Sequence, residues 1–420
     1  MRRTFIIIAL ALLPVSVNAQ TPPQRDSAAR ADSIARADSI ALVRELEAQQ
    51  ADTLGPRGQQ GPINPRLLPD ISVVGDFIAD FSPKGSTQEG GQRFGVRELE
   101  LAFQAAVDPY FRGDVFLGFT DEEGVAIEQA YLTATALPAR LEARLGRFIM
   151  PVGKQITTHR HDLHTVEYPY VIQSFFGPEG LKGTGIYLSR VFAPLGFYQE
   201  IIGTVVDRFG ESEDLVSFEA PNRRLSGLGY SARLRNYWDL GQSSNLELSF
   251  SGITGIREQP MSATIEDVNA INMRQSVIGA DLTYRWRPLQ RGLYKSLILQ
   301  AEVMQQRNQR PPPFPPPFAD PQDPPLEFLG PIGNFLGAYA FGRYQLTRRT
   351  YLGARYDFLE DPAADANTHA ASGYFEVFPS EFSKLVAAYE RFMPGGGAKA
   401  LHRFILQATF ALGPHKPHPF

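Results

Sequence analysis

The stretch that decides the fold is Glu98–Asp108, which reads ELELAFQAAVD. One face carries only apolar residues, namely Leu99, Leu101, Phe103, Ala105 and Val107. The opposite face carries mainly polar ones, including Glu98, Glu100, Gln104 and Asp108. Successive side chains of a β-strand point to opposite sides, so a period of two predicts a strand with one greasy and one polar face.

The same alternation recurs along the chain from about Asp70 to its end. It is clearest at 71–81, 111–119, 246–250, 278–286, 297–303, 352–358 and 404–412. Short turns and mostly longer polar loops separate these strands alternately, which is typical of an outer-membrane barrel. We therefore predict an all-β fold, a transmembrane antiparallel β-barrel of about sixteen strands. A soluble β-sandwich or β-helix would alternate too, but aromatic residues near many strand ends favour the barrel.

Two segments precede the predicted barrel. Residues 1–20 combine Arg2 and Arg3 with an apolar run and a small-residue pair at Val17 and Ala19, which predicts a secretory signal peptide. Residues 21–69 contain the hexapeptide ARADSI twice and are rich in Ala, Arg, Asp, Ser, Gln and Pro. This low-complexity composition predicts a disordered or helical periplasmic spacer, with residues 70–420 forming the barrel in the cell outer membrane.

Composition excludes several classes of function. The chain has 41 Lys and Arg against 45 Asp and Glu and no polybasic block, so nucleic acid is not an expected partner. Cysteine is absent, which removes thiolate metal sites and cysteine nucleophiles. No GxSxG element or other recognisable triad motif occurs, so we do not expect an enzyme.

Charged residues on the polar faces of the predicted strands are candidates for the pore lining. Opposed basic and acidic side chains inside a pore set a transverse field and select ions by charge. The alternative is that lumen faces are merely polar. The candidates are Arg140, Glu142, Arg144, Arg147, Arg233, Arg235, Asp281, Arg285, Arg355 and Asp357.

One predicted loop concentrates histidine. His159, His161 and His164 lie within six residues of one another, with Asp162 among them. Imidazole nitrogens and carboxylate oxygens are ligands of Zn²⁺, so these four residues are candidates for weak zinc binding. The alternative is that they are ordinary solvated loop residues, and no other cofactor is expected.

A family resemblance follows from several motifs. Residues Leu145–Gly153 read LGRFIMPVG, residues 159–162 read HRHD, and residues 168–177 read YPYVIQSFFG. Together with DPYFRG at 108–113 and EQAY at 128–131, they resemble outer-membrane porins of the phosphate-selective O/P-like type. They are also similar to a porin-like group often labelled zinc-regulated or TonB-dependent outer-membrane receptors. The plug domain of a TonB-dependent transporter has no counterpart in residues 21–69.

These observations predict a porin that allows diffusion of small hydrophilic solutes or ions. The alternative is a zinc-related receptor or uptake channel with a histidine-bearing loop. Expected partners are outer-membrane lipid, the barrel assembly machinery, the permeating solutes and, in a homotrimer, further copies of the chain.

Overall fold

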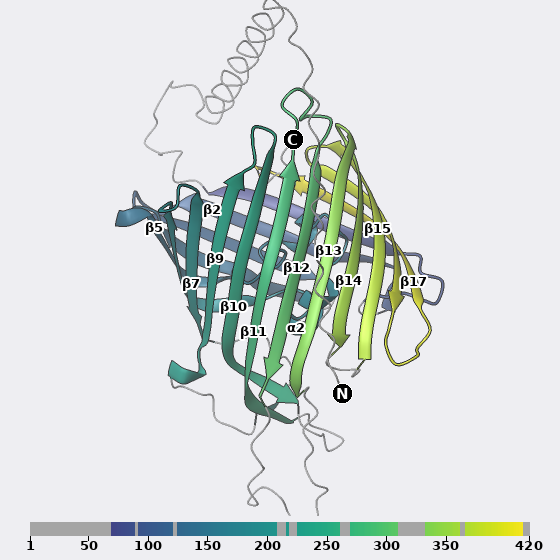
Figure 1. The fold of residues 1–420 in the computed structure, drawn as a ribbon, viewed down its shortest axis with the longest axis horizontal. Helices are drawn as coiled ribbons and strands as arrows, with labels where there is room; N and C mark the ends of the chain where they lie inside the picture. Colours follow the sequence, from purple (N-terminus) through teal and green to yellow (C-terminus); the bar gives the residue numbers. More distant parts are fainter. Residues whose placement is uncertain are drawn as a thin grey trace, which may run out of the picture. The chain divides into compact units, whose positions relative to one another are not determined.

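The computed structural model describes residues 69–88, 91–120, 124–207, 216–217, 225–260, 269–309, 332–361 and 366–414. The predicted signal peptide and periplasmic spacer lie outside these described residues. The described part is dominated by strands (Figure 1).

Seventeen strands are present in the described residues. They are β1 (Asp70–Asp80), β2 (Phe94–Ala106), β3 (Phe111–Thr120), β4 (Gly124–Ala134), β5 (Leu141–Ile149), β6 (Lys182–Phe192), β7 (Tyr198–Val206), β8 (Val216–Ser217), β9 (Gly229–Asp239), β10 (Ser244–Pro260), β11 (Asn269–Trp286), β12 (Leu297–Asn308), β13 (Gly333–Thr347), β14 (Thr350–Asp361), β15 (Ala366–Ser380), β16 (Ser383–Met393) and β17 (Leu401–Leu412).

Sixteen of these strands form a closed antiparallel barrel. Consecutive strands pair along the chain, with β7 pairing directly to β9, and β17 pairs back to β1 from Val73 opposite Leu412 to Asp80 opposite Ile405. The two-residue β8 stands apart and pairs in parallel with the start of β11. The predicted fold class and strand number are confirmed.

The helical segments of the described residues are short. They comprise α2 (Tyr170–Phe176) and the 3-10 turns η3 (Pro138–Arg140), η4 (Arg160–Asp162) and η5 (Leu225–Gly227). No helix in the described part of the chain is long and apolar enough to cross a membrane.

The two faces of the wall differ as the alternation predicts. Outward side chains are apolar and exposed, for example Leu145, Ile186 and Leu188 at 62%, 55% and 47%. Inward side chains are mostly polar or charged and buried, as for Glu376 at 0% and Asp281 at 2%. Closure of the barrel pairs the strand backbones without water, and the apolar outer belt matches the lipid, so the chain is an outer-membrane β-barrel.

One wide connection departs from an ordinary surface loop. Residues 150–181 join β5 to β6, and α2 contacts the inner wall at β13 and β14. In the view of Figure 1, α2 lies behind the front strands. This segment, called the inner loop below, positions the candidate site.

Gly146 shapes the strand that leads into the inner loop. Its φ of +136° lies in a region that residues with side chains rarely adopt. A Cβ built there would lie 2.1 Å from the carbonyl oxygen of Ala130 on β4. Gly146, the first glycine of the LGRFIMPVG motif, is therefore required by backbone geometry.

Replacing Gly146 by alanine should destabilise the barrel by about 2 kcal/mol or more, because strain and a backbone clash combine. The matched control is Gly203→Ala, since a Cβ at Gly203 would have no atom nearer than 4.0 Å. Heat-modifiable mobility and urea unfolding in lipid measure the effect. Equal stability of the two variants would show that the close approach at Gly146 is not a constraint.

Candidate functional site

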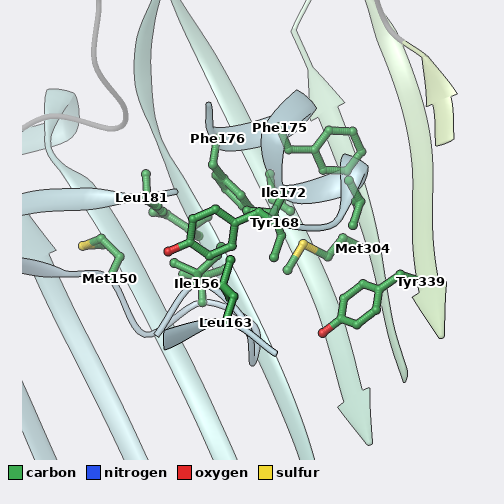
Figure 2. Packing of buried hydrophobic residues seen from close by; sticks show 14 of the residues in the cluster. Met150, Ile156, Leu163, Tyr168, Ile172, Phe175, Phe176, Leu181, Met304 and Tyr339 are labelled. Atoms are coloured by element: carbon green, nitrogen blue, oxygen red, sulfur yellow. The ribbon is translucent and has the colours of Figure 1, made fainter. Parts of the chain in front are cut away.

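The inner loop packs an apolar core inside the barrel. Figure 2 shows Met150, Ile156, Leu163 and Tyr168 with the aromatic residues of α2, facing Met304 and Tyr339 of the wall. Phe175, Val171 and Ile172 are fully buried. Wall residues in this cluster include Ile253, Val277, Met304, Tyr339, Phe341 and Leu359. These lumen-facing apolar side chains interrupt the polar wall and bind the loop by burying its greasy surface.

The start of the inner loop is held by charged wall residues. The backbone N–H of Gly153 donates to Ser251 Oγ at 3.0 Å, and Arg233 donates to the carbonyl of Gly153. The Lys154 ammonium donates to both carboxylate oxygens of Glu247, at 2.7 and 2.8 Å. Charge-assisted hydrogen bonds in a buried setting are the stronger kind, so this end is fixed to β9 and β10.

The middle of the inner loop is held by two buried cations. Arg355 on β14 donates to Thr165 Oγ1 at 3.0 Å and to the carbonyl of Glu167 at 2.6 Å. Lys384 on β16 donates to the carbonyls of His161 and Leu163, at 2.6 and 3.1 Å. Both side chains therefore satisfy loop backbone that would otherwise be buried without partners.

Glu167 is the anionic centre of the loop. Its carboxylate lies 2.9 Å from Arg160 and 3.4 Å from Arg97. Burial by itself raises the pKa of Glu167, but the charges of Arg160, Arg97 and Arg403 outweigh it and hold the pKa at about 2. This ion pairing therefore stabilises the loop fully above the ordinary carboxyl pKa and is lost as pH falls toward 2.

The structure brings two of the predicted histidines to β2. His159 Nδ1 lies 2.8 Å from Glu100, and His161 Nδ1 lies 3.8 Å from Glu98. One ligand atom from each of Glu100, His159 and His161 lies within 4.8 Å of the others. The side chain of His159 is 20% exposed, whereas those of His161 and Glu100 are 1% exposed.

Protonation of these histidines is favoured by their carboxylate neighbours. Burial lowers the pKa of His161, but Glu98, Asp162 and Glu100 outweigh that effect and raise it to about 9. For His159, burial is likewise outweighed, by Glu100, and its pKa is raised. The stabilisation from protonated His161 is complete below the ordinary histidine pKa of about 6.5 and is lost as pH rises through about 9.

The other two residues of the predicted zinc set lie differently. His164 stacks on Phe341 with ring centroids 6.1 Å apart and is not part of the cluster with Glu100. Asp162 Oδ2 lies 3.7 Å from His161 Nε2, at the edge of the cluster. The four predicted residues therefore do not converge on one point.

Among the pore-lining candidates, several reach accessible lumen. The ion pair between Arg144 and Glu142 measures 2.7 Å, with 32% and 41% of these side chains exposed. Arg144 also lies over the rings of Tyr131 and Tyr187. Arg235 and Arg285 flank Glu247 at 3.3 and 3.5 Å and keep about a third of their side chains exposed.

Two candidates do not face the lumen. Arg140 lies in the exposed turn before β5, with φ of 58°. Arg147 pairs directly with Ala130 and Thr184 and shares the strand face of exposed Leu145. The expectation for Arg140 is wrong because this residue lies in η3, and β5 begins only at Leu141. The expectation for Arg147 is wrong because it lies three residues after Arg144 on β5, so its side chain is on the opposite face of the strand.

The remaining four candidates face inward but are buried in ion pairs. Arg233 pairs with Asp281 at 2.9 Å, and Arg355 pairs with Asp357 at 2.7 Å. All four residues are at most 4% exposed. Arg233 and Arg355 hold the inner loop, so they act on the lumen through the loop rather than by touching a solute.

Sequence reasoning missed the wall residues that receive the loop. Glu100, Lys384 and Glu247 are inward-facing charges on predicted strands, and alternation alone could have selected them. Nothing in the sequence pairs them with a loop up to 223 residues away, as for Lys384 and His161. The usable signal was the apolar content of the loop, unusual for a segment exposed to water.

Comparisons with known proteins place this geometry among outer-membrane channels. No family model matches the sequence. An uncharacterized protein of Aquifex aeolicus is 26% identical over 400 residues, covering 84% of this chain and 80% of the relative. The solved structure of a loop L8 deletion mutant of OmpT, an outer membrane protein of Vibrio cholerae, matches with a TM-score of 0.50 and 12% identity over 82% of this chain and 99% of that one.

A second solved structure gives the same result. The outer membrane channel DcaP of Acinetobacter baumannii matches with a TM-score of 0.50 and 12% identity, covering 82% of this chain and 96% of that one. At these identities the likeness concerns the fold. The chain thus has the sixteen-strand barrel fold of outer-membrane channels.

The anchoring of the loop predicts a defined response to loss of Lys384. A single cysteine introduced as Val166→Cys, in a chain that has none, should react slowly with a small maleimide because Val166 is 2% exposed. Lys384→Met removes two charge-assisted hydrogen bonds of about 1.5 kcal/mol or more each, so labelling should accelerate at least about tenfold. Lys84→Met, at an exposed site, is the control. Unchanged labelling in a folded Lys384→Met variant would contradict this anchoring.

Proposed function

We propose that the protein is an outer-membrane porin through which small hydrophilic solutes or ions diffuse passively. The observation that carries the proposal is a closed barrel of sixteen strands whose polar lumen is narrowed by an inward-folded, anchored loop. A barrel of that size encloses an aqueous channel, whereas about eight strands leave an interior filled by side chains.

Two cavities at the short-turn end of the lumen support passage of polar solutes. One, of about 650 Å³, is lined by Tyr198, Arg235, Tyr237, Trp238 and Glu247 among others. Another, of about 280 Å³, is lined by four arginines, Arg285, Arg287, Arg343 and Arg348, together with His164 and Tyr351. Arg343 is neutralised by Glu376 through two hydrogen bonds of 2.7 and 2.8 Å.

The first cavity sets Arg235 against Asp239 and Glu247, whereas the second has four arginines and no carboxylate among its lining residues. The second cavity therefore favours anions over cations, because fixed positive charge raises the local anion concentration. The finer assignment to the phosphate-selective O/P-like group rests on the LGRFIMPVG, HRHD and YPYVIQSFFG motifs and is part of this proposal. Homotrimeric assembly and insertion by the barrel assembly machinery are further parts of it. The zinc-related receptor has no support from the matched structures, and we do not propose it as the function.

Selectivity of the reconstituted channel tests the proposal. Arg144→Gln, Arg235→Gln and Arg285→Gln together remove three accessible positive charges, while Glu247 keeps its partner Lys154. The anion-to-cation permeability ratio, from reversal potentials in a salt gradient, should fall by about twofold or more.

The matched control is Arg147→Gln, on the same strand as Arg144 but on its outer face. It should leave the permeability ratio unchanged. No conductance from the folded wild type would refute the porin proposal. Conductance with equal selectivity in all three proteins would refute the role of the three arginines.

A further inference from the structure

The contact between the inner loop and β2 contains more carboxylates than its fixed cations balance. Arg97 pairs with both Asp76 and Glu167, and Arg160 pairs with Glu167. Lys384 lies in the same region, where it donates to the carbonyl of His161. The five carboxylates here, against those three cations, are Asp76, Glu167, Glu98, Glu100 and Asp162. Arg403 also acts on Glu167, but its charge is matched by its own partner Glu390. With both histidines neutral, the five carboxylates would exceed the three cations by two charges in a largely buried setting.

Two kinds of cation can supply the missing charge. Two protons, one on each of His159 and His161, are one solution. The other solution is a single divalent ion bound by the same two imidazoles. The imidazoles are then neutral, and their nitrogens coordinate the ion instead of donating hydrogen bonds as cations. The second solution requires ligand atoms that already converge, so geometry decides whether it is available.

The ligand atoms converge. Those of Glu100, His159 and His161 lie within 4.8 Å of one another. Ligands about 2.0 to 2.1 Å from a tetrahedral zinc ion are about 3.3 Å apart. The 2.8 Å contact of His159 with Glu100 therefore has to open by about half an ångström, and the separations of up to 4.8 Å in the cluster have to close by up to about 1.5 Å. Water or Glu98, whose Oε2 is 3.8 Å from His161 Nδ1, is available for a fourth position.

The surroundings hold the imidazoles in place. The amide of Gln129 on β4 lies 2.9 Å from His159 Nε2, which leaves Nδ1 directed at Glu100. The ring of His159 packs at 5.4 Å from Phe116 and at 5.4 Å from His161. An outer partner on the second ring nitrogen is the usual companion of a metal-bound histidine, because it fixes the ring orientation.

We propose that Glu100, His159 and His161 form a binding site for a divalent transition metal, and Zn²⁺ is the ion to test first because two imidazoles and a carboxylate are a known zinc ligand set. The ion ties the inner loop to β2 through its two imidazole ligands and Glu100. The site differs from the set predicted from the sequence, since Glu100 of the wall takes the place of His164 and Asp162. Its role is to fix the loop, so it stands apart from the passage of solutes.

Calorimetric titration with ZnCl₂ tests the site on the purified, folded full-length barrel in detergent after chelator treatment. We expect one ion per chain at pH 8, with proton release seen as a dependence of the heat on the buffer. His159→Gln, His161→Gln and Glu100→Gln should each weaken binding at least about tenfold. His164→Gln, in the same loop but outside the cluster, is the matched control and should bind as the wild type does.

Heat-modifiable mobility verifies that each variant is folded, and X-ray absorption at the zinc edge reads the ligands directly. Two imidazole nitrogens with oxygen ligands support the site. Absence of zinc binding by the wild type overturns the proposal and leaves the two-proton solution. Binding that survives in His159→Gln and His161→Gln, or that disappears in His164→Gln, also overturns the assignment.

Discussion

Closure of the sheet between β1 and β17 is the constraint on which the rest of the molecule depends. In a bilayer an open sheet edge leaves backbone groups without partners, so the last strand must return to the first. The register from Val73 opposite Leu412 to Asp80 opposite Ile405 achieves this. Once the wall is closed, every strand has a lipid face and a lumen face, and the buried charged side chains of the wall gather on the second.

That restriction explains why the lumen is rich in paired charge. Arg233 with Asp281, Arg355 with Asp357 and Arg343 with Glu376 are all buried. A charge removed from water needs a partner of opposite charge. Arg233 and Arg355 also donate hydrogen bonds to the inner loop. The wall therefore holds the inner loop in two ways. Charged wall residues donate hydrogen bonds to the loop, and the apolar residues of the loop pack against an apolar patch of the inner wall.

The sequence predicts the fold far better than the site. Alternation at 98–108 and at the other strands requires only local information, which is why strand number and class could be predicted. The face on which a side chain lies is harder to predict. Strict alternation with Leu99 places Arg97 on the outer face, but a register shift opposite Asp76 and Phe77 brings its side chain into the lumen, where it binds Asp76. The inner loop was predicted as a loop, yet its inward fold depends on partners such as Met304 and Lys384 that lie far away in the chain.

In the function that we propose, the inner loop sets the width of a passive channel. The most direct measurement is single-channel conductance in planar bilayers, comparing the wild type with a variant in which residues 154–179 are replaced by a short glycine-serine linker. Both proteins must show heat-modifiable mobility, so that only folded barrels are compared. We expect open channels in both proteins and a severalfold higher conductance without the loop. Equal conductance in the two folded proteins would contradict this expectation.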